Sequence, residues 1–145
     1  MIITPHILAG AAIGVHSPNV WAAFCFGLIS HYLLDSLPHW DYLESIKISK
    51  FNHLAKILID FMIGSIIIVI LFWPLSFNIL IIFGIFGALL PDFIEFFYNN
   101  FKIKLLYPFS LFHNKIHYFK KISLLKGLPF QIIILIISIL FIKWG

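Results

Sequence analysis

Four side chains that can hold a metal ion or a proton lie close together in one stretch of a chain that has few charged residues. His31 and Asp35 are four residues apart, so on a helix they share one face and can bind the same ion. Pro38 is expected to end that helix, and His39 and Asp41 then lie on irregular backbone that can fold back towards the first pair. Imidazole and carboxylate groups are both good ligands for Zn²⁺ and similar ions. The pattern therefore predicts a metal site.

The same spacing also has a purely structural interpretation. Histidines near the C-terminal end of a helix complement the helix dipole and satisfy its last carbonyl groups. On this interpretation His31 and His39 stabilise a helix end and bind no ion. The two interpretations differ in what else must be nearby, because a metal site needs further ligands from other parts of the chain.

The composition is that of an integral membrane protein. The chain has 145 residues, of which 61% are hydrophobic and only 11% charged, and its mean hydropathy is +1.03. These values lie far from the average of soluble domains. Residues 1–4 carry no basic side chain ahead of the apolar run, so no cleavable signal peptide is expected. All ten basic residues are lysines, so a phosphate group would be bound by point charges and metal ions and not by a bidentate arginine.

The pattern of apolar residues predicts one all-α domain, a polytopic membrane helical bundle. Thr4 and Pro5 predict the start of a short N-terminal helix, since Thr is a good N-cap and Pro a good first helical residue. This helix ends near Gly14 and is too short to cross a bilayer. About four spanning helices are expected, together with an interfacial helix that carries His113 and His117. The expected spans are residues 19–37, 51–73, 77–98 and 128–144, and the interfacial segment is 101–126.

The lysines indicate how the bundle is oriented. The connection after residue 37 and the segment 101–126 hold most of the basic residues and lie on one side if the two helices between them both cross. That side is predicted to be cytoplasmic, with the protein in the inner or plasma membrane. Asp60 and Asp92 then lie about six to nine residues in from that side, within roughly 15 Å of it, as do His31 and Asp35. The topology alone therefore predicts that these groups converge.

A weak internal repeat would give the same arrangement. Residues 26–35 align without gaps on 83–92, with Phe, Gly, one Leu and Asp identical. Residues 1–42 would then correspond to 53–98, and each half would supply ligands to a shared site. His6 lies at the start of the first helix, so it joins the cluster if the first two helices form a hairpin.

The number of candidate ligands is larger than one tetrahedral zinc ion can use. They suit two metal ions bridged by a carboxylate, which can activate water and stabilise a leaving oxygen in phosphoester hydrolysis. One or two divalent ions are expected, zinc or alternatively manganese. Asp41 and Glu95 remain to orient the ligands or to act as a general base. The predicted ligands are His6, His31, Asp35, His39, Asp60, Asp92, His113 and His117.

A structural role is the alternative for the acids. Asp60 and Asp92 could instead form hydrogen-bonded pairs with histidines. Ionisable groups inside a membrane are expensive to bury, however, and are commonly functional.

Several short motifs resemble a known family. Thr-Pro-His6-Ile-Leu-Ala-Gly, Ser-His31-Tyr-Leu-Leu-Asp35, Leu-Leu-Pro-Asp92 and His113-x-x-x-His117 are similar to motifs of small bacterial membrane proteins described as membrane-bound metal-dependent hydrolases. More distantly, the segment from His31 to Pro38-His39 resembles the ligand-bearing helix of zinc-dependent phospholipase C enzymes. The resemblance implies a divalent metal and a hydrolytic reaction, on a lipid phosphoester or a similar amphiphile.

The sequence thus predicts a membrane-embedded metal-dependent hydrolase with membrane lipids as its surroundings and no nucleic-acid partner. A small transporter of protons or metal ions could use the same aspartates and histidines, although a transport path also needs polar residues towards the opposite side. A non-catalytic membrane adaptor whose lysine-rich segment 102–126 lies on anionic lipid is a third possibility.

Overall fold

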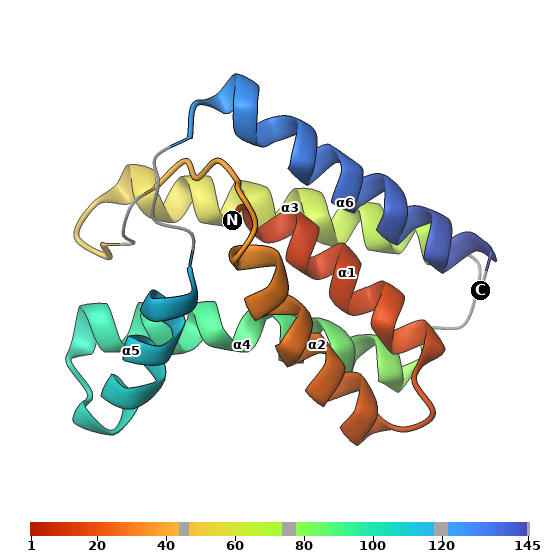
Figure 1. Ribbon diagram of the computed structural model, residues 1–145, viewed down its shortest axis with the longest axis horizontal. Coiled ribbons are helices and arrows are strands. Elements are labelled where there is room, and N and C mark those ends of the chain that lie inside the picture. The colour runs from red at the N-terminus through yellow and green to blue at the C-terminus, as the bar shows by residue number, and fades with distance from the viewer. Residues whose placement is uncertain (44–46, 74–77, 118–121, 145) are drawn as a thin grey trace.

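The computed structural model describes residues 1–43, 47–73, 78–117 and 122–144. Throughout this part of the chain the regular structure is helical, as predicted (Figure 1). The predicted turn at Pro74 and the predicted helix start at Phe77 lie outside the described residues. The helices are α1 (Ile3–His16), α2 (Val20–Asp35), α3 (Phe51–Phe72), α4 (Ile79–Phe101), the 3₁₀ turn η1 (Lys104–Leu106), α5 (Tyr107–Ile116) and α6 (Leu124–Trp144).

Among the described residues three helices, and not the four expected, are long and apolar enough to cross a bilayer: α3, α4 and α6. The predicted span over residues 19–37 is wrong in length. The Asn19 side chain accepts a hydrogen bond from the backbone N–H of Ala22 and starts α2, and the helix ends at Asp35, before Pro38. Its 16 residues extend about 24 Å, which is less than the hydrocarbon thickness of about 30 Å.

Two other helices differ from the sequence-based boundaries. In the described part of the interfacial segment, the turn η1 leads into the ten-residue helix α5, which carries His113, while His117 is its C-cap residue. The last helix starts at Leu124, ahead of the predicted residue 128, and includes Pro129 in its first turns. Pro129 is the sixth residue of this helix and has no N–H, so the usual hydrogen bond to the carbonyl of Leu125 is absent.

Helices α1, α2 and α4 form the tightly packed centre of the bundle, and glycines make their contact possible. Gly27 of α2 and Gly10 of α1 both face the backbone of Gly84 in α4, and a side chain at any of the three would overlap a neighbouring helix. Small residues at such crossings let membrane helices approach closely. Gly27 lies against Gly84, and His31 further along α2 contacts Ala88 further along α4, so the two helices run in the same direction.

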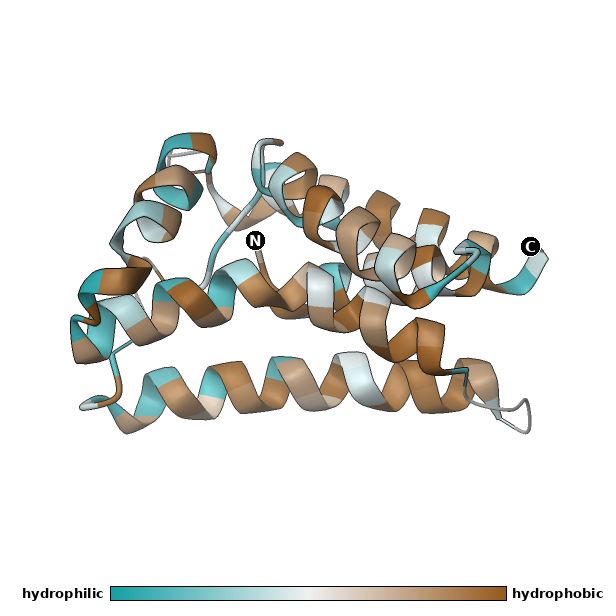
Figure 2. Cartoon of the chain, turned by 90° about the horizontal axis from the view of Figure 1, so that it is seen from below, coloured by the Kyte–Doolittle hydropathy of each residue, from teal (hydrophilic) through white to brown (hydrophobic). Residues whose placement is uncertain are grey.

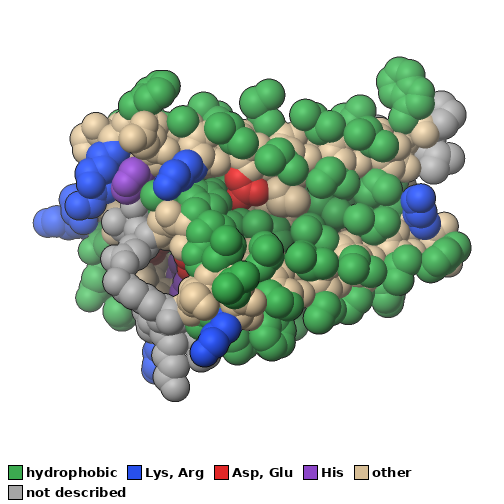
Figure 3. Space-filling view, turned by 90° about the horizontal axis from the view of Figure 1, so that it is seen from above, with side chains coloured by type: hydrophobic (Ala, Val, Ile, Leu, Met, Phe, Trp, Pro, Cys, Tyr) green, Lys and Arg blue, Asp and Glu red, His purple; other side chains and the backbone are tan. Residues whose placement is uncertain are grey.

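The outer surface of the long helices is apolar. Large hydrophobic side chains such as Leu58, Ile70, Ile82 and Phe141 are exposed along α3, α4 and α6, whereas hydrophilic residues gather towards the end of the molecule where α5 lies (Figure 2). Most of the lysines visible in Figure 3 lie towards one end of the molecule, beside a long band of apolar side chains. The three long apolar helices identify the chain as a membrane protein.

Candidate metal centre

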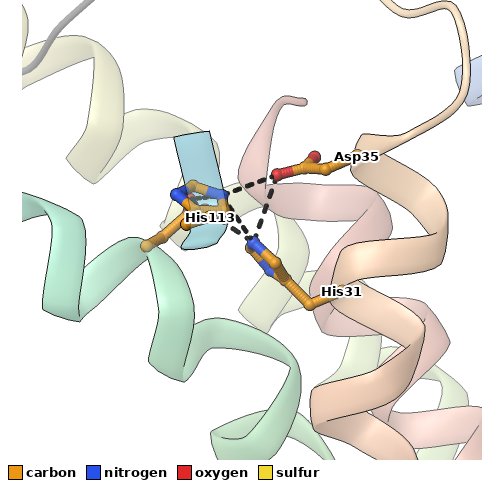
Figure 4. Close-up of side chains that lie close together, drawn as sticks. His31, Asp35 and His113 are labelled. Carbon is orange, nitrogen blue, oxygen red and sulfur yellow. Dashed lines mark hydrogen bonds and ion pairs between the residues drawn. The ribbon is translucent and has the colours of Figure 1, made fainter. Parts of the chain in front are cut away.

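Asp35, the last residue of α2, lies at the centre of the candidate site and is fully buried. Its Oδ2 atom is 3.1 Å from Nε2 of His31 and 3.1 Å from Nε2 of His113 (Figure 4). Its Oδ1 atom is 3.1 Å from Nε2 of His6 and 2.9 Å from the Met1 amino group. One carboxylate therefore joins α1, α2 and α5.

The first group of possible ligands comes from three helices. One ligand atom each from His31 and Asp35 (α2), Asp92 (α4) and His113 (α5) lie within 4.8 Å of one another. The i, i+4 spacing places the first two on one face of α2, as predicted, and the parallel packing of α4 on α2 brings Asp92 to 3.7 Å from Nε2 of His31. Asp92 is 29% exposed at its side chain, so the group reaches the surface.

The backbone fixes the orientation of the His31 ring. Nδ1 of His31 lies 2.7 Å from the carbonyl oxygen of Ala88, so this nitrogen carries a proton and donates it to that carbonyl. Nε2 of the same ring then faces the cluster, 3.1 Å from Oδ2 of Asp35 and 3.2 Å from Nε2 of His113. A histidine that binds a metal usually has this arrangement, with its other nitrogen held by a carbonyl or carboxylate.

A second group shares Asp35 with the first and adds His39 and His117, again with their ligand atoms within 4.8 Å of one another. Here too the backbone fixes the ring, since Nδ1 of His39 donates to the carbonyl oxygen of Leu37 at 2.7 Å. The irregular backbone after the end of α2 therefore turns His39 back towards the helix end, as the position of Pro38 predicted. Nε2 of His117 is 3.8 Å from Oδ2 of Asp35.

His6 lies beside the two groups without belonging to either. Its ring stacks on His31 with centroids 4.3 Å apart, it is fully buried, and its Nδ1 has no hydrogen-bond partner among the described residues. Its only polar contact in the site is therefore Asp35. We expect His6 to orient this carboxylate or to become a ligand after a small rotation.

Asp60 is the predicted ligand that the structure places elsewhere. Its carboxylate accepts hydrogen bonds from the backbone N–H groups of Ile3 and Thr4, at 2.6 and 3.2 Å, and from the hydroxyls of Thr4 and Tyr42, at 2.5 and 3.1 Å. A carboxylate in this position caps the start of α1 from a neighbouring helix, because the first N–H groups of a helix lack partners within it. Asp60 thus anchors the helix that carries His6, and the predicted capping role of Thr4 is replaced by this contact.

Replacing Asp60 by Ala is expected to lower the stability of the protein by about 2 to 3 kcal/mol while leaving its metal content unchanged, because several hydrogen bonds to one buried charge are lost. Thermal unfolding and metal analysis of the same preparation measure both effects. The matched control is Tyr42→Phe, which removes a single hydrogen bond to the same carboxylate and should cost about 1 kcal/mol. Loss of metal without loss of stability in Asp60→Ala would contradict the anchoring role.

The two residues predicted to orient ligands or act as a base lie on opposite sides of the cluster. Oδ2 of Asp41 lies 3.1 Å from Nε2 of His39, its Oδ1 lies 3.0 Å from the Met1 amino group, and the side chain is part exposed. Glu95 lies 4.0 Å from Nδ1 of His113 and accepts hydrogen bonds from Ser110 at 2.5 Å and Asn114 at 3.0 Å. Glu95 therefore holds α5 against α4.

The local charges shift the acid–base behaviour of groups outside the spanning helices. Burial opposes charge on His113, but its contacts with the carboxylates of Asp35, Glu95 and Asp92 outweigh burial and raise its pKa to about 9. Burial likewise opposes charge on Asp41, but the hydrogen bond from His39 and the Met1 amino group lower the pKa of Asp41 to about 2. The cluster is thus rich in negative charge that needs protons or a cation to balance it.

The donor set fits a divalent metal ion. Because Nδ1 of His31 is held by a backbone carbonyl, its Nε2 is the nitrogen that faces the cluster, where one atom from each of two imidazoles and two carboxylates lies within 4.8 Å of the others. Imidazole nitrogen and carboxylate oxygen are the ligands of zinc and manganese sites. Of the eight predicted ligands, the structure brings six into the two groups, places His6 in contact with them and puts Asp60 at the start of α1.

Other partners of the site were not predicted from the sequence. Ser110 and Asn114 bond Glu95, and the carbonyl groups of Ala88 and Leu37 fix the imidazole rings. Ser110 precedes His113 by three residues, a spacing that places both on one helix face. This spacing could have identified Ser110 as a neighbour of the site. The backbone carbonyls leave no mark in the sequence.

Comparisons of the chain with protein-family models, with curated proteins and with solved structures find no match in any of the three. The function is therefore inferred from the site itself.

Proposed function

We propose that this protein is a membrane-embedded hydrolase that depends on a divalent metal ion, zinc or alternatively manganese. The observation that carries the proposal is the first group, in which His31, Asp35, Asp92 and His113 converge from three helices with an imidazole already oriented by a backbone carbonyl. Ligands gathered from separate helices, with orienting partners behind them, are the usual construction of a metal site.

The proposed ligands are His31, Asp35, Asp92 and His113 for one ion, and Asp35, His39 and His117 for a second ion that shares the carboxylate. A bound divalent ion supplies Lewis-acid stabilisation of negative charge on a phosphoryl oxygen and makes water more acidic. The chain supplies the proton acceptors. Asp41, with its low pKa, stays ionised near neutral pH, and Glu95 faces the outer nitrogen of His113.

We propose a phosphoester of a lipid or another amphiphile as the substrate. The support is the position of helix α5, which carries His113 and lies towards the end of the molecule where most of the visible lysines gather (Figures 1 and 3). Lysine ammonium groups attract phosphate as point charges, and anionic lipids concentrate near such surfaces. The lysine-rich end is proposed to face the cytoplasm.

The test begins with the metal content of the purified protein, measured together with hydrolysis of a phosphomonoester and a phosphodiester in detergent micelles. We expect stoichiometric zinc or manganese and hydrolysis that a chelator abolishes and the metal restores. In His31→Ala and Asp92→Ala we expect loss of hydrolysis together with loss of the ion held by the first group. Metal flux into liposomes without hydrolysis would favour the transporter. Full metal content in both variants would refute the site.

Metal affinity is expected to rise with pH up to about 9. His113 binds its proton more tightly than an ordinary histidine, so below its pKa of about 9 a metal ion must displace that proton. For one displaced proton the apparent affinity increases about tenfold per pH unit between pH 7 and 9 and then levels off. Competition with a chelator of known affinity measures this dependence, and an affinity that does not change over this range would contradict the role of His113 as a ligand.

A further inference from the structure

Helix α5 has its polar side facing the protein and its apolar side facing outward. Ser110 and His113 are 2% and 5% exposed and point into the bundle, whereas Phe109 and Phe112 are 53% and 52% exposed. Leu105, in the 3₁₀ turn before the helix, is 78% exposed. A helix on the surface of a water-soluble domain has the opposite arrangement, with its apolar stripe towards the core.

The helix also packs across the last turns of α4 (Figure 1). The rings of Tyr107 and Tyr98 are 5.7 Å apart, Ser110 bonds Glu95 at 2.5 Å, and Nε2 of His113 is 3.9 Å from Asp92. Successive residues along α5 therefore contact progressively earlier residues of α4. The chain therefore returns from the level of Tyr98 to that of Asp92, six residues or about 9 Å towards the middle of the spanning helix.

At the depth of α5, the outer face of α4 is itself apolar. Phe93, Phe97 and Phe101 follow one another at four-residue spacing and are all about half exposed. They belong to one of the three candidate spans. The exposed aromatic face of α5 therefore continues the apolar surface of a candidate membrane-spanning helix. Because the two apolar surfaces are continuous, we expect both to face the same environment.

Lysines flank the apolar face of α5 at its two ends. Lys102 and Lys104 precede the helix, Lys115 lies in its last turn, and all three are exposed. The ammonium group of Lys102 lies 5.3 Å from the centre of the Tyr98 ring. Long lysine side chains beside apolar surface extend to the lipid phosphates, and Tyr is common at that level.

We propose that α5 is inserted in the leaflet of an anionic bilayer, as a re-entrant helix beside α4. Phe109 and Phe112 contact acyl chains just below the headgroups, and the three lysines contact lipid phosphates. The outer side of the helix then contacts the acyl chains, while its inner side carries His113 and faces the metal centre. This placement does not depend on bound metal or on hydrolysis.

The experiment uses the full-length protein in vesicles of phosphatidylcholine and phosphatidylglycerol. The only cysteine, Cys25, is replaced by Ser, and a nitroxide label is attached to single cysteines at Phe109 and Phe112. The controls are labels at Phe93, on the apolar face of α4, and at Lys50, in the exposed connection before α3. Collisions with oxygen, which concentrates in lipid, and with a water-soluble nickel complex are measured at each label.

Both α5 labels are expected to resemble the Phe93 label, with more oxygen collisions than nickel collisions, while the Lys50 label shows the reverse. Nickel accessibility like that at Lys50 would overturn the proposal by placing α5 in water. Low accessibility to both reagents would also overturn it, because the face would then be covered by protein. All substituted side chains are exposed, so misfolding is not expected, and two separate α5 positions guard against a local effect of either label.

Discussion

The Asp35→Asn protein is expected to lose all bound metal, with affinity reduced by about 100-fold or more. Asp35 contributes an oxygen to both groups of candidate ligands, so a single replacement removes a charged ligand from each. Loss of partners that merely orient ligands costs about 10- to 100-fold, and loss of a shared ligand should cost at least as much. Asn preserves the size of the side chain, so the packing at the end of α2 is retained.

Matched variants make the result specific. Asp92 belongs only to the first group and His39 only to the second. If two ions bind, metal analysis should show two per chain in the unmodified protein, about one in Asp92→Asn and in His39→Ala, and none in Asp35→Asn. Equal loss in all three variants would indicate a single ion, and unchanged metal content in Asp35→Asn would contradict the proposed centre.

Much of the site was predictable because it depends on simple geometry. The i, i+4 spacing of His31 and Asp35 needs only a helix, and Pro38 needs only to end it. The prediction that Asp92 would meet them follows from counting helices that cross back and forth. The structure brings these groups together although one spanning helix fewer is present, because α2 still runs in the same direction as α4.

The length of α2 was predicted wrongly because hydropathy does not show where a helix ends. The apolar run continues through Leu37, but Ser36 and Leu37 close the helix with hydrogen bonds to carbonyls of the last turn. Asp60 was misassigned for a related reason. A buried carboxylate can bind a cation or cap a helix, and only the structure shows that the free N–H groups of α1 lie against it.

The return of α5 along α4 could not be read from the sequence either. Its polar and apolar faces are visible in the spacing of Ser110 and His113 against Phe109 and Phe112, but the pattern does not say which face points inward. Hydrogen bonds from Ser110 and Asn114 to Glu95 decide this. Buried polar groups must find partners, so a single acidic residue on α4 fixes the orientation of the helix that delivers His113.

Replacing Gly84 by Val is expected to lower the stability of the bundle by about 3 kcal/mol or more. A Cβ atom at this position would overlap the carbonyl oxygen of Gly10 and lie 3.0 Å from the backbone nitrogen of Gly14. Helix backbone cannot move aside as a side chain can, so α1 would have to shift away from α4. The carbonyl of Gly84 also faces Gly27, so the shift would loosen the contact with α2.

The control is Ile82→Val, which introduces the same residue at an exposed position of the same helix and should change stability by less than about 0.5 kcal/mol. Thermal unfolding in one detergent measures both variants, and metal content measured at low temperature follows the site. Because α1, α2 and α4 together position His6, Asp35 and Asp92, the loosened protein should lose metal at a lower temperature than the control. Equal unfolding temperatures for the two variants would mean that α1 does not pack on α4 at Gly84, and the convergence of ligands from these helices would then lose its structural basis.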